Sequence, residues 1–511
     1  MLFLQIIILY EIKVSALARW VKFLINLRGN RVECLLRKYS LEAGFMMFQT
    51  TLVWFRNDLR VFDHTALQEA VRFGLPVVGL YVFEPIESVH SEGGRRRRVF
   101  VHQCLSELQS RLAEKGVPLF VTVGLAEQDV PAFAREIDAI YVVCASADEP
   151  EAVNQENMIA ARLIEDGCRF KAVNDHVLLS KFTLADSEGR PYTEFQVYRK
   201  AWLAASAGMV WQASDDWQTL ARLQTGLSEN LTIAPEIPSL AQLGVADQSV
   251  TVAGGEQAAD ELLAEFLLRM GDYHPEQGLS VKCNESQLWP YLRFGVLSVR
   301  YVIDLIKNKS ASGAGERLDA LIRREFYHQL IYHYPNVLRE SFNPKYRNIV
   351  WENNPVYFSA WQQGQTGYPL LDASMRYLNQ TGYLPDELRN YTAAFLTQIL
   401  LCDWRLGAAY FAGQLLDFDL AVNNGSWQDA AGVGTKAFRP EQMMHPVFAA
   451  QKLDPAGQII RRYIPELAHM PKDFIHMPWL AKGNMNTNNY PDPIVEYASQ
   501  REKALVLYGA G

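Results

Sequence analysis

The sequence predicts an α/β domain followed by an all-helical domain. Between residues 50 and 173, short apolar runs rich in β-branched residues alternate with segments of helical periodicity. From about residue 257 to about residue 483, helical segments follow one another without further strand patterns. At 511 residues the chain is also too long for a single hydrophobic core, which favours two domains.

Four strands are expected in the α/β domain, at residues 51–55, 77–83, 119–123 and 139–144. Helical periodicity follows each of them, at residues 64–73, 98–115, 129–136 and 151–166. Strands that alternate with helices in this way pair in parallel through right-handed crossovers, so we expect a parallel sheet. No G-x-G-x-x-G pattern follows the first strand, which argues against a dinucleotide pyrophosphate bound at that point.

The predicted domain boundaries follow shifts in composition. Residues 1–45 begin with an apolar run that lacks a preceding basic region and a following cleavage site, so a signal peptide is not expected. Methionines at positions 46 and 47 directly precede the first strand, and we interpret residues 1–45 as a disordered extension or an artefact of start-site choice. We then expect the α/β domain at residues 46–173, a connector at 174–265, the helical domain at 266–485 and a tail at 486–511.

Composition limits the class of protein. The net charge of −8 argues against a generally basic nucleic-acid-binding surface but is compatible with a local basic groove. The six cysteines contain no C-x-x-C pair and are typical of reduced, buried thiols. No stretch reaches the roughly 18 apolar residues that a membrane helix needs. We therefore expect a cytoplasmic protein without a membrane span and without a bound metal.

Residues 417–434 (DFDLAVNNGSWQDAAGVG) are the most informative segment for function. The segment is too polar for a core and too aromatic for a surface loop. Buried polar groups need partners, and a planar heteroaromatic ligand with many donors and acceptors would supply them. The alternative is that Asp417 and Asp419 cap a helix and that the Asn-Asn-Gly step is a turn.

Several motifs, in the same order along residues 48–470, resemble those of DNA photolyases and cryptochromes. They are VWFRNDLR at 53–60 with Asp63, GRPYT at 189–193, PYLRFG at 290–295 and REFY at 324–327. The resemblance is strongest over 361–428, which contains WQQGQTGYPLLDASMRYLNQTG, DWRLG and DFDLAVNNGSWQ. It implies an antenna-type α/β domain joined to an all-α, FAD-binding C-terminal domain.

The resemblance also implies roles for residues around the flavin. Asn423 matches the residue that faces flavin N5, where its side-chain carbonyl can accept a hydrogen bond from the protonated atom. Asp417 and Arg389 match an acid–arginine pair beside the ring, which must be jointly satisfied when buried. Asp419 matches a partner of the pyrimidine edge or ribityl chain, and Arg324 a further cofactor contact.

The phosphate-binding segment departs from the family pattern. The family shows a hydroxyl-rich run where this chain has NESQLWP at 284–290. Tyr273, Ser286 and Leu288 are the cofactor contacts that the resemblance still implies. Glu285 brings negative charge toward a pyrophosphate, so weaker FAD retention is expected.

Three tryptophans form a second constellation. Each alone is more often a core residue than an electron carrier. Trp427, Trp404 and Trp351 nevertheless all match the positions at which the family places its relay from flavin to surface. The resemblance therefore implies electron transfer with Trp427 nearest the flavin, then Trp404, and Trp351 at the solvent end.

The substrate pocket departs further from the family. Family members that repair cyclobutane dimers receive the flipped lesion between a glutamate, two tryptophans, an asparagine and a methionine. A flipped dimer needs aromatic walls to stack on and polar groups for its base edges. At the matching positions, in that order, this chain has Ala320, Arg323, Asp429, Asp386 and Asn390.

Two functions are therefore expected as alternatives. The first is an FAD-dependent blue-light flavoprotein that repairs pyrimidine dimers in DNA, a deoxyribodipyrimidine photo-lyase (a carbon–carbon lyase). The second is a cryptochrome-like photoreceptor that has lost repair. We expect a monomer that contacts DNA through a local basic groove, formed by Arg323, Arg339, Lys345, Arg347, Lys436 and Arg439.

Three further features carry weaker expectations. Residues 95–98 are four arginines at the start of an expected helix, interpreted as a solvated loop rather than a nucleic-acid patch. His328 and His333 have no metal-ligand companions in the sequence and are interpreted as packing residues. Asp58 and Glu149 lie near the family's folate position, so a second antenna chromophore, folate or another, is expected in that cleft.

Overall fold

The computed structural model describes residues 49–85, 91–209, 211, 232–233, 235–245, 250–270, 286–309, 313–481 and 485–509. The predicted extension at residues 1–45 lies outside these ranges and stays a prediction. Residues Thr50–Gly511 form one compact unit, whose described part contains both predicted kinds of domain. The expected fold class, an α/β domain followed by a helical domain, is confirmed.

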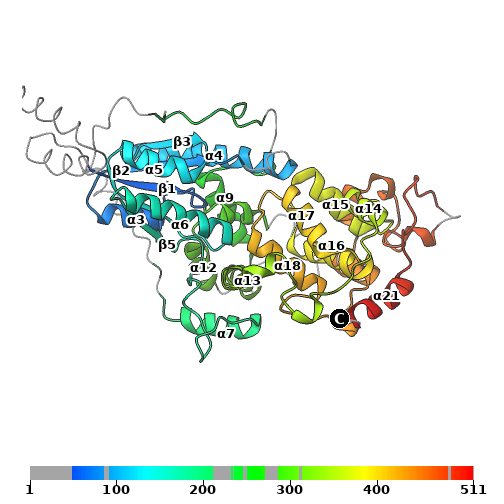
Figure 1. Cartoon of the computed structure of the whole chain (residues 1–511). Coiled ribbons are helices and arrows are strands. Elements are labelled where there is room, and N and C mark those ends of the chain that lie inside the picture. The colour runs from blue at the N-terminus through cyan, green and yellow to red at the C-terminus, as the bar shows by residue number, and fades with distance from the viewer. Residues whose placement is uncertain are drawn as a thin grey trace, which may run out of the picture. The chain divides into compact units, whose positions relative to one another are not determined.

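A five-stranded parallel sheet forms the core of the α/β domain, in the order β3-β2-β1-β4-β5 (Figure 1). The strands are β1 (Thr50–Phe55), β2 (Val77–Phe83), β3 (Leu119–Val123), β4 (Ala139–Ala145) and β5 (Arg169–Val173). The four predicted strands are present, and β5 was missed. Its sequence RFKAV carries two cations and is half exposed, as suits an edge strand that pairs only with β4.

Helices cover both faces of the sheet. They are α3 (Thr65–Arg72), α4 (Glu92–Glu114), α5 (Ala126–Glu136) and α6 (Pro150–Glu165). Because side chains alternate along a strand, Leu52 and Trp54 of β1 pack with α5 and α6 on one face. Val53 and Phe55 pack with α3 and α4 on the other face. This second cluster continues into the helical region, so the two domains share a core.

The crevice between β1 and β4, where the strand order reverses, is filled by the chain itself. In open α/β sheets this crevice commonly binds ligands. Here the turn between α11 (Trp289–Arg293) and α12 (Val299–Lys307) enters it, and Leu59 N donates to Phe294 O at 3.0 Å. A Cβ at Gly295, which has a φ of +60°, would lie 2.1 Å from Asn57 O. Only glycine permits this approach.

The predicted connector carries ordered helices that belong to the shared core. They are α7 (Phe195–Ser206) and α9 (Glu256–Arg269), and the predicted boundary at 265/266 falls inside α9. Trp202 of α7 is fully buried and donates from Nε1 to Glu325 Oε2 at 2.6 Å. The connector is therefore part of the packing between the two domains.

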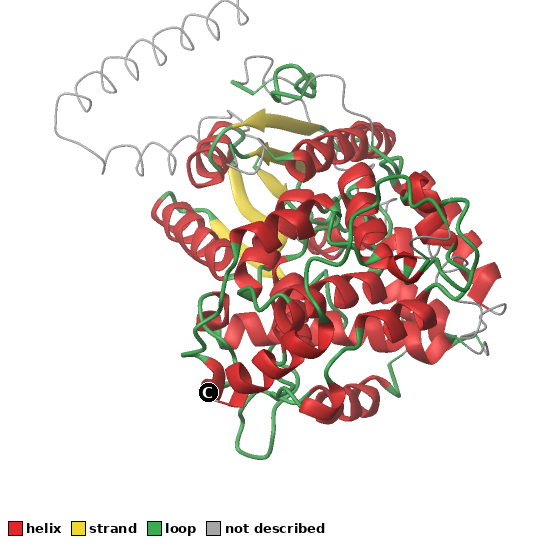
Figure 2. Cartoon of the chain, turned by 90° about the vertical axis from the view of Figure 1, so that its right-hand side faces the viewer, coloured by secondary structure: helices red, strands yellow, loops and turns green. Residues whose placement is uncertain are grey.

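The helical domain continues to the end of the described chain (Figure 2). Its helices are α13 (Ala314–His333), α14 (Pro355–Gln363), α15 (Pro369–Thr381), α16 (Asp386–Ala394), α17 (Trp404–Gln414), α18 (Leu420–Ala431), α19 (Pro446–Leu453), α20 (Gln458–Tyr463) and α21 (Tyr497–Gly509). A π-helical segment, Phe395–Ile399, follows α16 directly. Short 3-10 segments lie at Ser286–Leu288, Pro335–Leu338, Pro344–Tyr346, Pro440–Gln442, Pro465–Leu467 and Pro478–Leu480. In the described ranges, no helix has both the length and the apolarity to span a membrane.

Two segments that the sequence suggested were peripheral are packed. Residues 486–511, predicted as a tail, contain α21, whose buried Tyr508 donates from its hydroxyl to Ala431 O at 2.8 Å. The arginines at 95–98, interpreted as a solvated loop, lie inside α4, which begins three residues earlier. That interpretation was wrong, because three of the four guanidiniums bind carbonyls of other elements.

Candidate functional site

A cavity of about 430 Å³ lies in the helical domain. Its walls come from α13, α16, α17 and α18, with Trp289 and Arg293 of α11 at one end. Its volume is within the usual range of roughly 300–1,000 Å³ for small-molecule sites. Exposed residues such as Asp386, Asn390 and Lys436 mark its mouth.

Most of the site residues expected from the sequence line this one cavity. The residues expected to bind the cofactor that line it are Arg324, Arg389, Asp417, Asp419 and Asn423. All five residues expected to bind the substrate line it too: Ala320, Arg323, Asp386, Asn390 and Asp429. Trp427 of the expected electron relay lines the cavity as well. The residues expected to bind the cofactor and those expected to bind the substrate therefore line the same cavity.

The three expected phosphate contacts are not part of this wall. Leu288 is 6% exposed and packs in the core shared by the two domains. Tyr273 and the side chain of Ser286 lie outside the described residues. The cations nearest that end of the cavity are Arg293, which the sequence analysis missed, and Arg324.

Arg389 and Asp417 form the expected buried pair. Nη2 of Arg389 donates to Asp417 Oδ2 at 2.7 Å, and Nε donates to Leu384 O at 2.6 Å. Burial opposes the charge on Arg389, but Asp417 and then Asp386 outweigh it, so the pKa of Arg389 lies above its usual value. The second oxygen of Asp417, Oδ1, is buried and has no hydrogen-bond partner among the described residues.

Asp419 caps a helix, as the alternative interpretation predicts, and it also contacts His328 and Arg324. Its Oδ1 accepts from Val422 N at 3.1 Å and so caps α18. Its Oδ2 lies 3.0 Å from His328 Nε2 and 3.6 Å from Arg324 Nε. Burial opposes ionisation, but His328, Arg293 and Arg324 hold the pKa of Asp419 well below its usual range. Asp419 is therefore an anion in the cavity wall.

Asn423 and Trp427 stand one helical turn apart on α18, and both line the cavity. The side-chain amide of Asn423 donates to Ala408 O at 3.1 Å, which turns its carbonyl oxygen away from α17. Trp427 is 2% exposed, and its ring contacts Phe411 and Trp361 at centroid distances of 5.0 and 6.0 Å. A Cβ at Gly407 of α17 would lie 2.1 Å from the Trp427 ring, so the helices pack closely here.

The other two relay candidates lie farther from the cavity. Trp404 is the first residue of α17 and is 1% exposed, with the Arg405 guanidinium 4.8 Å from its ring centroid. Trp351 is half-buried, and its ring lies 5.9 Å from that of Tyr508. The relay order stays a prediction. Trp361 is a buried ring beside Trp427 that the sequence analysis did not single out.

At the mouth, two residues expected to face a substrate are already engaged. The Arg323 guanidinium stacks 3.7 Å from the centroid of the Phe195 ring. Oδ2 of Asp429 accepts from the Tyr327 hydroxyl at 2.9 Å. Its Oδ1 accepts from both the backbone N and the hydroxyl of Thr435 at 3.0 Å. Asp429 therefore holds the loop after α18, and a role for it toward a substrate stays a prediction.

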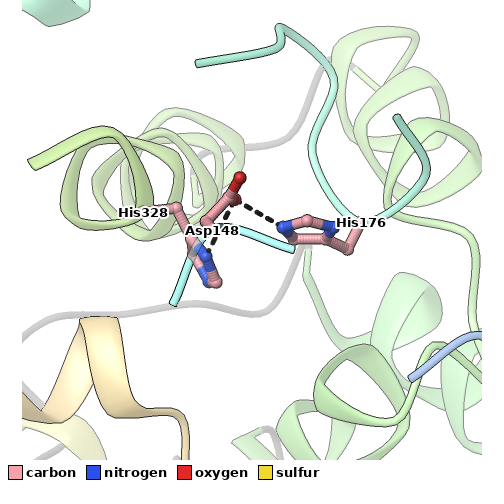
Figure 3. Close-up of side chains that lie close together, drawn as sticks. All are labelled: Asp148, His176 and His328. Carbon is pink, nitrogen blue, oxygen red and sulfur yellow. Dashed lines mark hydrogen bonds and ion pairs between the residues drawn. The ribbon is translucent and has the colours of Figure 1, made fainter. Parts of the chain in front are cut away.

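One charged cluster behind the cavity was not expected. His328, interpreted as a packing residue, lies between Asp419 and Asp148, and Asp148 also contacts His176 (Figure 3). Asp148 follows β4 and His176 follows β5, more than 140 residues before His328, so no local pattern could reveal the cluster. His333 Nε2 lies 2.9 Å from Lys181 O, as suits a packing residue.

These groups fit FAD in two respects. The buried and unpaired Oδ1 of Asp417 lines the cavity and needs a donor, which a flavin or its ribityl chain has. The buried Trp427 and Phe411 rings supply apolar wall, while Asn423 supplies a polar group. The fold and site thus define a two-domain protein with a heteroaromatic cofactor pocket in its helical domain.

Comparison with known proteins identifies the family. Residues 51–219 match the DNA photolyase family, and residues 317–510 match the FAD binding domain of DNA photolyase. A deoxyribodipyrimidine photo-lyase of Vibrio cholerae is 32% identical over 467 residues, which cover 89% of this chain and 98% of that protein. The chain belongs to the DNA photolyase family and has its FAD-binding domain.

Two solved structures are similar over nearly the whole chain. A cryptochrome of Synechocystis has a TM-score of 0.80 at 26% identity, covering 90% of this chain and 99% of its own. An archaeal photolyase of Sulfolobus tokodaii, described with two FAD molecules, has a TM-score of 0.74 at 28% identity. That alignment covers 91% of this chain and 100% of the archaeal one.

Proposed function

We propose that this protein is a light-dependent DNA-repair lyase that binds FAD in the cavity and splits pyrimidine dimers, the reaction of a deoxyribodipyrimidine photo-lyase. The observation that carries the proposal is the composition of the cavity. Its inner wall holds the Arg389–Asp417 pair, Asn423 and Trp427, and its mouth opens beside exposed cations. Family membership and the names of the relatives support the same reaction.

The inner residues have separate roles in this proposal. FAD bound here supplies light absorption and one-electron transfer. Asp417 would accept a hydrogen bond from the cofactor through its free Oδ1, while Arg389 holds the other oxygen of the carboxylate in place. The carbonyl of Asn423 would serve as the polar group beside the flavin ring, and Trp427, Trp404 and Trp351 would supply electrons to the flavin. The contacts of Arg389 and Asp417 support their roles, the position of Asn423 and Trp427 in the cavity supports theirs, and the family resemblance alone supports those of Trp404 and Trp351.

DNA is the proposed partner of the cavity mouth. Lys436 and Arg323 line the mouth, and Lys436 is exposed. The other cations expected in the basic groove are exposed and are proposed to belong to the same surface: Arg339, Lys345, Arg347 and Arg439. Such side chains bind phosphates through counterion release, independently of base sequence. We propose that a monomer in the cytoplasm binds DNA in this way.

A second candidate function is a cryptochrome-like photoreceptor without repair activity. The specific observation in its favour is the mouth of the cavity. Arg323 stacks on Phe195 and Asp429 binds the following loop, so neither side chain offers a flat surface to a flipped dimer. Base stacking on an aromatic side chain contributes roughly 1–3 kcal/mol, which is missing here.

A second chromophore in the α/β domain is also proposed, as the Sulfolobus relative with its two FAD molecules suggests. The two residues expected to bind folate offer little to it. Asp58 is fully buried, accepts from Arg56 N at 2.7 Å and lies 3.1 Å from His64 Nε2. Glu149 pairs with Arg293 at 3.4 Å. A chromophore other than folate therefore fits the proposal better.

The test combines flavin analysis with a repair assay. We expect the purified protein to contain nearly one FAD per chain. We expect blue light to cause dimer splitting in oligonucleotides, weaker in duplex than in single-stranded DNA because a duplex adds the cost of base flipping. Splitting equal to that of a dark control, with flavin present and photoreducible, would favour the photoreceptor instead. Protein that takes up no FAD would contradict both functions.

A further inference from the structure

The cluster behind the cavity joins the α/β domain to the cavity wall. Nε2 of His176 lies 2.6 Å from Asp148 Oδ2, and Nδ1 of His328 lies 3.2 Å from the same oxygen. Figure 3 shows both imidazole rings directed at this carboxylate. The other ring nitrogen of His328 lies 3.0 Å from Asp419 Oδ2. His328 thus stands between two carboxylates, one from each domain.

Contact with two carboxylates decides the protonation state of His328. A neutral imidazole carries one hydrogen, so one of its nitrogens would present a lone pair to an ionised carboxylate. An imidazolium carries a hydrogen on both nitrogens and a positive charge that attracts both carboxylates. Asp148 and Asp419 are 5% and 6% exposed, so water screens these interactions little. The geometry favours the imidazolium.

Every element packed against His328 contributes a charged group. Asp148 comes from the segment after β4, and the segment after β5 contributes His176 and Lys181, whose Nζ lies 2.8 Å from Asp148 Oδ1. Arg324, one turn earlier on α13, donates to His176 O and lies near Asp419. Asp148 therefore has Lys181 beside it, Asp419 is influenced by Arg324 and by Arg293 of α11, and His328 bridges the two carboxylates.

A metal ion fits this cluster poorly, although Asp148, His176 and His328 have suitable ligand atoms within 4.8 Å of one another. The 2.6 Å between His176 Nε2 and Asp148 Oδ2 is a hydrogen-bond distance. Ligands about 2.0 Å from a tetrahedral ion stand roughly 3.3 Å apart. A divalent ion would also add two charges where Lys181 and Arg324 already balance the carboxylates, whereas one proton adds only one.

We propose that His328 is a positioning residue for the bound cofactor: as an imidazolium bridging Asp148 and Asp419, it holds the Asp419 carboxylate in one orientation toward FAD. The proposal rests on the FAD site described above and extends it to a residue outside the cavity wall. Asp419 uses Oδ1 to cap α18 and Oδ2 to bind His328. Both oxygens are therefore oriented before a cofactor arrives, which lowers the entropic cost of binding.

The pKa of His328 supports the bridge and gives it a pH signature. Burial and the nearby Arg324 oppose protonation, but Asp419 and Asp148 outweigh them and raise the pKa of His328 to about 9. The unfolded value is about 6.5. The stabilising charge is therefore fully present below about pH 6.5 and is lost as the pH rises through the folded value. FAD affinity should fall in the same upper range.

The experiment measures FAD release on dilution of the holoprotein between pH 6.5 and 9.5, by the rise in flavin fluorescence. We expect the FAD affinity of the wild type to stay constant up to about pH 8 and to fall above that pH. His328→Gln should bind FAD about tenfold more weakly at pH 7, since it loses a charge-assisted hydrogen bond, and its profile should be flat. Asp148→Asn should shift the wild-type midpoint to lower pH, although Asp148 does not line the cavity.

His445→Gln is the matched control, because His445 caps α19 and does not line the cavity. It should keep the wild-type profile, and ionisation of FAD itself would appear in every variant alike. A flat wild-type profile would overturn the proposal, even if both cluster variants failed to fold. An unshifted midpoint in Asp148→Asn would overturn it too, as would stoichiometric zinc whose removal weakens FAD binding. Wild-type protein without FAD would instead contradict the proposed function.

Discussion

At the scale of single residues, burial determines which of two carboxylates interacts more strongly with the Arg389 guanidinium. Asp417 and Asp386 both face Arg389. The Asp417 side chain is 1% exposed and lies 2.7 Å from the guanidinium, whereas the Asp386 side chain is 54% exposed and lies 3.9 Å away. Solvent screens the second pair and not the first, so the two interactions differ in strength although their chemistry is the same.

This difference leads to a matched pair of substitutions. We expect Asp417→Asn to lower the free energy of unfolding by about 3 kcal/mol, because it leaves a buried guanidinium without its counter-charge. We expect Asp386→Asn to change it by less than about 0.5 kcal/mol. Urea unfolding of both variants without FAD measures the two values. Equal changes in the free energy of unfolding would mean that water screens Asp417 as strongly as it screens Asp386.

The relay can also be tested one residue at a time. We expect Trp427→Phe to make photoreduction of the flavin by an external reductant markedly slower, because a phenylalanine ring is much harder to oxidise. Trp361→Phe is the control, since Trp361 contacts the Trp427 ring at 6.0 Å but does not line the cavity. The measurement is the loss of flavin absorbance under blue light. Unchanged photoreduction in Trp427→Phe, or equal slowing in both variants, would contradict the predicted route.

At the scale of secondary-structure elements, α4 joins the two domains through its arginines. Nη2 of Arg96 donates to Asn379 O and Gln380 O, in the last turn of α15, at 3.0 and 3.1 Å. Nη1 of Arg97 donates to Ala412 O and Leu415 O at the end of α17. The last carbonyls of a helix lack intrahelical partners and carry partial negative charge. The guanidiniums of α4 therefore cap two helices of the other domain.

Replacing one of these arginines should weaken the contact between the domains. We expect Arg97→Met to lower the free energy of unfolding by about 2 kcal/mol, because two carbonyls lose a charged donor. Arg95→Met should change it by less than about 0.5 kcal/mol, since Arg95 pairs with Glu92 of its own helix. Thermal unfolding of both variants compares them. A larger loss of stability in Arg95→Met than in Arg97→Met would show that the bonds from Arg97 to the end of α17 do not stabilise the contact between the domains.

At the scale of the whole molecule, charge is distributed unevenly. The net charge is −8, so long-range attraction to DNA cannot come from the protein as a whole. The exposed cations Lys436 and Arg439 follow α18 at the cavity mouth. Binding to DNA should therefore depend on a local surface and weaken as salt screens it.

A salt titration can assign this surface. We expect Lys436→Gln to weaken DNA binding and to lower the slope of log affinity against log salt by about 1. Arg190→Gln is the control, because Arg190 is exposed but pairs with Asp186 and Glu188 at 3.0 and 2.9 Å. Its slope should match the wild type. The same slope in Lys436→Gln as in the wild type would place the DNA surface elsewhere.

Local patterns determined the fold class and four of the five strands, whereas the family resemblance supplied the expected residues that line the cavity. Strand and helix patterns record burial at fixed periods, so they can be recognised without tertiary information. The motif residues Asp417, Asp419 and Asn423 stand within seven positions of one another, at the start of one helix. Arg389 could be assigned from the family resemblance, and its pairing with Asp417 was then confirmed.

The tertiary structure decided which partners these residues have. His328 shows no local signal, because Asp148 and His176 reach it only when the loops after two strands meet α13. Asp429 matches a position of the family's substrate pocket, and only the fold shows that the following loop supplies donors for its carboxylate. Charged and polar side chains satisfy themselves with whatever groups packing brings near, and those groups come from distant parts of the chain. Sequence therefore determined most of the expected residues that line the site, and packing determined their hydrogen-bond partners and added Arg293 and His328.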